Sequence, residues 1–258
     1  MPIHDGLALN KGIIKFDVGG ETITRMLLQE IEQVKHVQVR PRYTFRKNVR
    51  CTTDKAGEMQ ILPEFTLENR EFPNTHPSFH RAAMLEIVRD LKETHCKVSD
   101  TAYSDASYQN IPTVPYEMPD GSQLELGSER FRIPELLFNC TGPLDNGSVG
   151  FVGVHQMAFD AITRCDMDIR KELYGNVVLA GGNTLFTGFT ERLTKKLMDL
   201  SSQNIKVKLI ASPSSIERKF SAWIGGSILA SLSSFQQMWM SKREYEEHGA
   251  ILVDRKCA

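Results

Sequence analysis

Apolar residues recur along the chain with helical spacing in several long segments. In residues 21–34 (ETITRMLLQEIEQV) and 84–96 (MLEIVRDLKETHC) they return at every third or fourth position, which predicts two helices that each bury one face. On the second helix, Lys92 and Glu93 are expected on or beside the exposed flank. Further helices are predicted at His155–Cys165, at Thr187–Leu200 and, as a long closing helix, near Gly226–Tyr245.

Short apolar runs between the helices predict strands. Such runs occupy Gly12–Phe16, Asn176–Leu179 and Lys206–Ile210, and residues 113–126 predict two strands joined by a turn at 119–121. Residues 51–80 are polar and lack a clear period, which indicates an insertion or a mobile excursion from the fold. Strands that alternate with helices over short connections predict an α/β architecture.

Composition and charge exclude several classes of protein. The 258 residues are 41% hydrophobic and 24% charged, which is typical of a globular chain. Lys and Arg number 31 against 32 Asp and Glu, so no overall charge attracts nucleic acid or a membrane. The five cysteines are scattered without the spacing of zinc ligands, which favours reduced thiols in the cytosol or nucleus. No segment approaches the roughly 18 apolar residues of a membrane span, and none resembles a signal peptide.

Residues Lys35–Arg50 (KHVQVRPRYTFRKNVR) form a local basic stretch. It holds six Lys or Arg and no Asp or Glu, with Tyr43 and Phe45 interleaved. Basic and aromatic residues in this arrangement suit DNA or histone binding. A solvated basic strand or loop produces the same pattern, so both interpretations stay open.

Two glycine-rich segments are candidates for binding a ligand. LDNGSVG at 144–150 has the residue types of a phosphate-binding loop, but a loop rather than a buried strand precedes it, which favours a surface turn. NVVLAGGNTL at 176–185 places Gly181 and Gly182 between a strand and a helix. Adjacent glycines there allow a ligand to contact the backbone beside a helix N-terminus, or they serve close packing alone.

The segment WIGGSILASLSSFQQMWMSKREY carries a broad apolar stripe. Its members are Ile228, Leu229, Leu232, Phe235, Met238 and Trp239. Packing into the core is the ordinary explanation for such a stripe, while methionines beside small residues also suit a groove for a partner helix.

Several motifs resemble the C-terminal half of actin and the actin-related proteins. They are FRIPELLF, CDMDIRKELYGNVVLAGGNTL, ERKFSAWIGGSILASLSSFQQMWMSKREY and the terminal DRKCA, and the similarity runs from Gly6 to the last residue. PIHDG, KVSDTAY, TVPYEMPDG, AGGNTL, ASPSSIERKF and an insertion between Val37 and Pro77 resemble a nuclear type within that family, known as a BAF-complex subunit. The resemblance implies an α/β, actin-like (ribonuclease H-like) fold, as its C-terminal half only, with the N-terminal half missing.

The resemblance also implies a division into subdomains. Residues 1–17 would begin subdomain 3, and 18–145 would form subdomain 4 with the insertion near 38–77. Residues 146–220 would complete subdomain 3, and 221–258 would return to subdomain 1.

Two sets of site residues follow from the resemblance. The adenosine side of the family's nucleotide cleft would be lined by Gly20, Lys92, Glu93, Gly181, Gly182 and Lys219, with Arg89 nearby and Phe186 in place of a frequent tyrosine. The groove that receives binding partners would comprise Ile224, Ile228, Leu229, Leu232 and Met238, with Gly6 at its edge.

The resemblance argues against catalysis and filament formation. The family's phosphate loops and catalytic residues belong to the N-terminal half. Phosphoryl transfer depends on positioning the phosphates, so this chain is expected not to be an enzyme and to bind ATP weakly or not at all. LDNGSVG falls where actin carries a short apolar loop that inserts between filament subunits, and a polar loop would be costly to bury there.

The resemblance implies a non-catalytic scaffold subunit of nuclear chromatin-remodelling and histone acetyltransferase complexes. Its partners would be actin and a long helix of the motor subunit, and no membrane is involved. A nucleotide-binding cytoskeletal filament protein is the alternative. Half of a cleft-forming fold would expose apolar surface, so poor stability without partners is expected.

Overall fold

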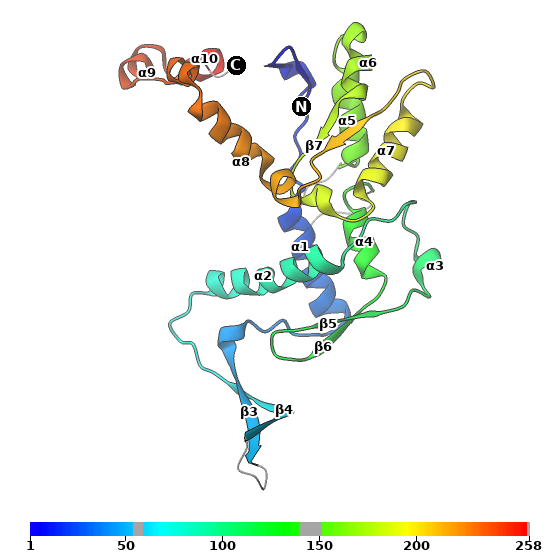
Figure 1. Cartoon of the computed structure of the whole chain (residues 1–258), viewed down its shortest axis with the longest axis vertical. Helices are drawn as coiled ribbons and strands as arrows, with labels where there is room; N and C mark the ends of the chain where they lie inside the picture. The colour runs from blue at the N-terminus through cyan, green and yellow to red at the C-terminus, as the bar shows by residue number, and fades with distance from the viewer. Residues whose placement is uncertain (54–58, 140–150, 257–258) are drawn as a thin grey trace.

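The chain forms an elongated molecule with two lobes and a projecting arm (Figure 1). The computed structural model describes residues 1–53, 59–139 and 151–256. Its strands pair into four two-stranded sheets. The strands are β1 (Ile3–His4), β2 (Leu7–Ala8), β3 (Phe45–Thr53), β4 (Met59–Asn69), β5 (Val114–Glu117), β6 (Gln123–Leu126), β7 (Val177–Leu179) and β8 (Leu209–Ala211).

Helices make up most of the remaining regular structure. The α-helices are α1 (Gly20–Gln29), α2 (Pro77–His95), α3 (Asp105–Tyr108), α4 (Glu129–Glu135), α5 (Val154–Thr163), α6 (Met167–Gly175), α7 (Phe189–Leu200), α8 (Ser215–Ser231), α9 (Lys242–His248) and α10 (Leu252–Lys256). Shorter helical turns are η1 (Asn10–Gly12), η2 (Glu30–Val34), η3 (Arg42–Thr44), η4 (Gly182–Leu185) and η5 (Ser233–Met238). Within the described ranges, no helix is long and apolar enough to cross a bilayer.

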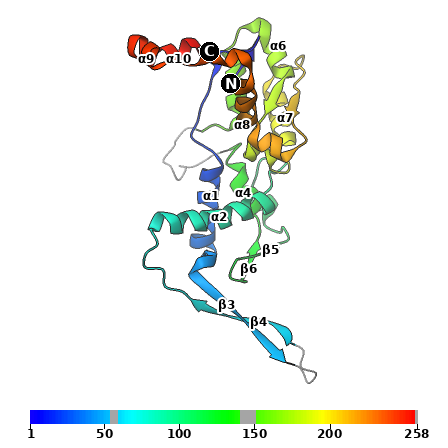
Figure 2. The ribbon, with the colours of Figure 1, turned by 60° about the vertical axis from the view of Figure 1, so that its left-hand side comes forward.

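The two helices predicted from apolar spacing in the N-terminal part, α1 and α2, cross in the middle of the molecule (Figures 1 and 2). Ile23 and Leu27 of α1 and Leu91 of α2 are fully buried where they pack. Pro77 opens α2, and the His76 side chain accepts a hydrogen bond from the Ser78 amide at 3.2 Å, which satisfies one donor of the first turn. Packing between the apolar faces of α1 and α2 stabilises the lobe from which the arm projects.

The second lobe is built on the parallel pair β7–β8, with α5, α6 and α7 around it (Figure 1). The strands predicted at 176–179 and 206–210 and the helices predicted at 155–165 and 187–200 are confirmed. Most of their ends differ from the predicted ones by one to three residues. Arg192 of α7 is 1% exposed and forms an ion pair with Glu135 of α4, with 2.8 Å between Nη2 and Oε1. Its Nη1 donates to the Ser99 carbonyl at 2.9 Å, so one buried guanidinium joins three segments.

The arm is an antiparallel hairpin formed by β3 and β4. Backbone pairing runs from Phe45 opposite Asn69 to Thr53 opposite Met59, with an irregularity between Val49 and Cys51. The sequence indicated an insertion or a mobile excursion over 51–80; the described part forms the paired strands of the arm and the start of α2, regular elements that the sequence pattern did not predict. The arm returns to the body where Phe65 packs under the β5–β6 turn, since a Cβ at Gly121 would lie 2.2 Å from the Phe65 ring. That turn was predicted at 119–121 and is confirmed.

Two other predictions fail. Gly12–Phe16 is not a strand, because η1 occupies its start and no described segment supplies a pairing partner. The long helix over 226–245 is three shorter elements: α8 begins earlier and ends at Ser231, η5 follows, and α9 starts afresh. Ser241 and Glu244 form a reciprocal capping box at the start of α9, so the sequence there favours a new helix start over continuation.

Candidate functional site: a charged cleft and an exposed apolar helix

Residues predicted for the nucleotide cleft gather around one cavity of about 600 Å³. It lies among α1, α2, η4 and α8, and five of the six predicted residues line it: Gly20, Lys92, Glu93, Gly182 and Lys219. Arg89 and Phe186 line it as well, together with Glu21, Asn183 and Leu185, which the sequence did not single out. The role of these residues in holding a nucleotide remains a prediction.

Gly20 lies at the first turn of α1, where its lack of a side chain matters. A Cβ at this position would lie 3.2 Å from Asn183 Oδ1 and 3.3 Å from Lys92 Nζ. Both distances are tighter than ordinary van der Waals contact, so glycine lets Asn183 and Lys92 approach the helix start closely.

Lys92 supports the cleft from within rather than from its surface. It is 5% exposed, and its Nζ donates to the Gly20 carbonyl at 3.1 Å and to Thr24 Oγ1 at 3.0 Å. Burial lowers the pKa of the Lys92 ammonium, against the opposing effect of neighbouring Glu93. The prediction that placed Lys92 and Glu93 on or beside the exposed flank was wrong for Lys92, because the crossing of α1 over α2 covers that position, while Glu93 is exposed as predicted.

The other cations of the cleft are paired with carboxylates. Arg89 bonds Glu21 and Glu86, each at 2.6 Å, and the hydrogen bond to Glu21 is the main cause that raises the pKa of Arg89. Lys219 of α8 lies 3.3 Å from Glu93 of α2. An anionic ligand in this cleft would therefore have to compete with internal carboxylates for each of these two cations.

Gly181 shapes the turn at the edge of the cleft without lining it. Its φ of 94° lies in a region that favours glycine, and its amide donates to the Arg218 carbonyl at 2.8 Å. Thr184 returns a hydrogen bond to the Gly181 carbonyl through its hydroxyl, at 2.8 Å. The glycine pair therefore joins η4 to the start of α8.

The residues predicted as a partner groove lie on an exposed helix. On α8, Ile228 is 59% exposed, Leu229 53% and Leu232, just past its end, 50%. Ile224 is also exposed, while Met238 is half-buried in η5. The interpretation of this stripe as core packing was wrong, since none of its members is buried in the described structure.

Trp223, which the prediction missed, belongs to the same region and is 80% exposed. We call Trp223, Ile224, Ile228, Leu229 and Leu232 the α8 apolar surface. The sequence signal that could have revealed Trp223 is its place in the same helix as Ile224, although the two side chains lie about 100° apart around the helix axis. Large exposed apolar side chains gathered on one element are typical of interaction surfaces.

Two cations of the basic stretch Lys35–Arg50 have partners within the chain. Lys35 pairs with Glu129 at 2.7 Å, and Arg40 donates to the Asn69 side chain at 2.5 Å. The side chain of Arg50 lies outside the described residues. LDNGSVG also lies outside the described residues, which end at Asn139 and begin again at Phe151. Among described side chains, no group of three or more His, Cys, Asp or Glu is arranged to hold a metal.

The whole chain, residues 1–258, matches the family model described as Actin, and it belongs to the actin family. The mixed α/β structure is consistent with the actin-like fold. The chain is similar to Actin-related protein 4 of Arabidopsis thaliana, with 45% identity over 265 residues, and to Actin-related protein 4 of Oryza sativa subsp. indica, with 43% over 263. Each comparison covers 99% of this chain and 57% of the relative, so the chain spans little more than half the length of these curated relatives.

Proposed function

We propose that the chain acts as a non-catalytic scaffold subunit of nuclear chromatin-remodelling and histone acetyltransferase complexes. In this role it pairs with actin and docks on a long helix of the motor subunit through the α8 apolar surface. The observation that carries the proposal is the exposure of Trp223, Ile228, Leu229 and Leu232 along one helix.

The chemistry of this surface favours a helical partner. Ile224, Ile228 and Leu232 follow one another at four-residue steps, which is the spacing that presents a continuous apolar row on a helix. A second amphipathic helix covers such a row efficiently, since its own apolar side chains repeat with the same period. Similarity to Actin-related protein 4 of two plants supports a place in the actin-related branch of the family.

The charged cleft supports a structural rather than a catalytic role. Its cations Arg89 and Lys219 are engaged by carboxylates of the chain, and buried Lys92 bonds α1. These contacts tie α1, α2 and α8 to one another. The proposal therefore assigns ATP hydrolysis to other subunits.

Co-purification tests the scaffold proposal. The chain tagged after Ala258 is recovered from nuclear extract beside a variant carrying Ile228→Asp and Leu232→Asp. We expect the native chain to recover actin and a remodelling motor, and the variant to lose at least about tenfold of both, because charges replace two central apolar contacts.

A matched control carries Met167→Asp and Met198→Asp, which place the same charges on exposed apolar positions of α6 and α7. This control should recover both partners as the native chain does. Retention of the motor by the α8 variant, or its equal loss from both variants, would contradict docking through α8.

A further inference from the structure

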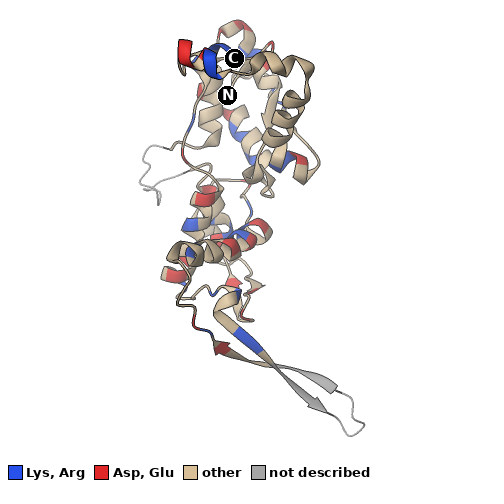
Figure 3. Cartoon of the chain, turned by 90° about the vertical axis from the view of Figure 1, so that its left-hand side faces the viewer, with Lys and Arg blue, Asp and Glu red and all other residues tan. Residues whose placement is uncertain are grey.

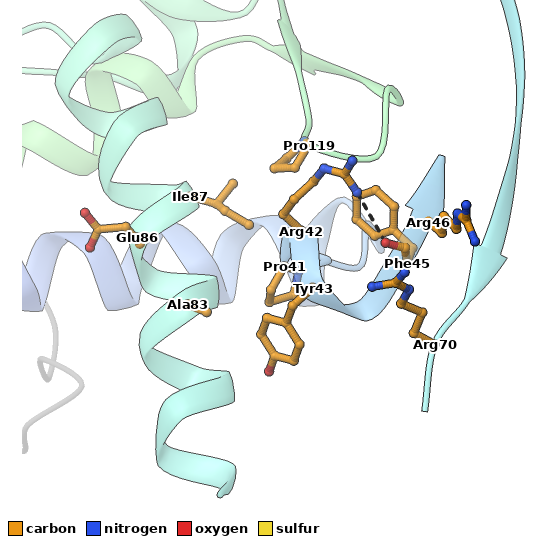
Figure 4. Close-up of a pocket in the computed structure, with 10 residues that line it drawn as sticks. All are labelled: Pro41, Arg42, Tyr43, Phe45, Arg46, Arg70, Ala83, Glu86, Ile87 and Pro119. Atoms are coloured by element: carbon orange, nitrogen blue, oxygen red, sulfur yellow. Dashed lines mark hydrogen bonds between the residues drawn. The ribbon is translucent and has the colours of Figure 1, made fainter. Parts of the chain in front are cut away.

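A second hollow lies at the base of the arm (Figure 4), and no residue of the α8 apolar surface lines it. It has a volume of about 680 Å³ and lies where η3 and the start of β3 meet α2 and the β5–β6 turn. Ala83, Ile87 and Pro119 provide apolar walls. Arg42, Arg46 and Arg70 gather beside Phe45 at its other side, as Figure 4 shows.

The register of the arm brings distant arginines together. Arg46 is in β3 and lies opposite Glu68 of β4, two residues before Arg70. The Arg70 amide donates to the Thr44 carbonyl at 2.9 Å, which fixes the chain beside η3. Figure 3 shows the blue basic segment at the start of β3.

These arginines lack the acidic partners that neighbouring cations have. Lys35, Arg89 and Arg132 all pair with carboxylates. Arg42 instead donates to the Phe45 carbonyl at 3.2 Å and lies over the Phe45 ring, 5.1 Å from its centre. Neither Arg46 nor Arg70 has a carboxylate partner within the part of the chain that the structure describes.

The acidic group of this hollow, Glu86, does not neutralise the cluster. Its Oε2 accepts a hydrogen bond from Arg89 at 2.6 Å, on the side of α2 that leads to the charged cleft. The carboxylate of Glu68, opposite Arg46 in the hairpin, accepts a hydrogen bond from the Asn48 side chain at 3.2 Å and forms no ion pair with Arg46 among the described residues. Three guanidinium groups therefore line the apolar-walled hollow without a carboxylate paired to any of them.

We propose that this hollow binds an acidic peptide segment of a partner protein, with one apolar side chain seated between Ile87 and Pro119. Carboxylates flanking that side chain would bond Arg46 and Arg70, because the planar guanidinium matches a carboxylate with two parallel hydrogen bonds. Arg42, held against Phe45, keeps a third positive charge at the rim.

Nucleic acid fits this hollow less well. A phosphate backbone is tracked by a continuous row of cations, whereas Lys35 and Arg40 at one end of the basic stretch already bond Glu129 and Asn69. A compact arginine cluster with aliphatic and proline walls suits carboxylates beside an apolar anchor instead.

Fluorescence anisotropy with a defined probe tests the proposal. The probe is a labelled short peptide in which one leucine is flanked on both sides by pairs of glutamates. Comparison probes replace the glutamates by glutamines or the leucine by serine, and a labelled single-stranded oligonucleotide represents nucleic acid.

We expect the glutamate peptide to bind the full chain, with binding that weakens as salt is added. Arg46→Gln with Arg70→Gln should weaken it by at least about tenfold. Lys171→Gln with Arg243→Gln changes the net charge equally at exposed positions elsewhere and should leave binding within about twofold.

Ala83→Glu gives an independent test, because it places a carboxylate and its stem in the hollow on a helix that tolerates glutamate. This variant should lose the peptide while circular dichroism stays native. Equal binding of the glutamine and glutamate peptides, unchanged binding by both hollow variants, or tighter and arginine-dependent binding of the oligonucleotide would overturn the proposal.

Discussion

Helices α7 and α8 differ in which side chains they bury: α7 buries a charged side chain, and α8 exposes large apolar ones. Helix α7 buries a guanidinium, Arg192, at 1% exposure, whereas α8 leaves an indole, Trp223, at 80% exposure. In α7 the buried charge is paired with Glu135 and donates to the carbonyl groups of Ser99 and Thr101, while Arg192 Nε and Glu135 Oε2 stay buried without a hydrogen bond. In α8 the exposed apolar row has no such partner in the described chain. The contrast separates a helix whose buried groups find partners within the described chain from a helix whose apolar side chains do not.

Breaking the Arg192 pair should have the largest effect on stability. Arg192→Met leaves Glu135 buried without its counter-charge, and we expect a loss of about 3–5 kcal/mol in the free energy of unfolding. Burial already outweighs the attraction of Arg192 in raising the pKa of Glu135, so the isolated carboxylate has no favourable environment. Chemical denaturation followed by circular dichroism measures the loss.

Two controls sharpen that measurement. Arg243→Met removes an exposed arginine and should stay within about 0.5 kcal/mol of the native chain. Adding Glu135→Met to Arg192→Met should recover part of the loss, since no unpaired charge then remains buried. Equal losses for the single and double variants would mean that packing, and not the charge, determines the effect.

The corresponding change on α8 should have a small effect on stability. Ile228→Asp with Leu232→Asp alters exposed positions and should change the free energy of unfolding by about 0.5 kcal/mol or less. The same variant should aggregate less in light scattering, because it interrupts the α8 apolar surface. A loss comparable to that of Arg192→Met would show that α8 packs within the isolated chain after all.

Local pattern predicted the helices that bury one face within the chain. The spacing of Ile23, Leu27 and Leu91 was sufficient for α1 and α2, because packing follows periodicity when both partners belong to the chain. It failed for α8, where the same kind of stripe stays exposed. An apolar row looks identical in sequence whether its partner is the core or another molecule.

The burial of Lys92, the arm and the arginine cluster depend on contacts between segments that are distant in the sequence, so local pattern did not predict them. Lys92 is buried because α1 crosses α2, and Gly20 makes room for its ammonium. The arm was missed because its strands support each other across the hairpin and not through one strong apolar alternation. Arg46 and Arg70 are brought close only by the pairing of β3 with β4. No linear sequence motif therefore predicts the hollow beside Phe45. Five of the six cleft residues implied by the resemblance to actin line one cavity, as do Arg89 and Phe186, but their ligand remains a prediction.

Hydrogen exchange along α7 and α8 tests most directly whether the α8 apolar surface receives a partner. Exchange is followed by mass spectrometry for the chain alone and for its purified complex with actin and the motor's long helix. We predict fast exchange over α8 in the free chain, slowed by about tenfold or more in the complex, while α7 is protected in both. Exchange over α8 that is equally fast in the free chain and in the complex would contradict docking on this surface.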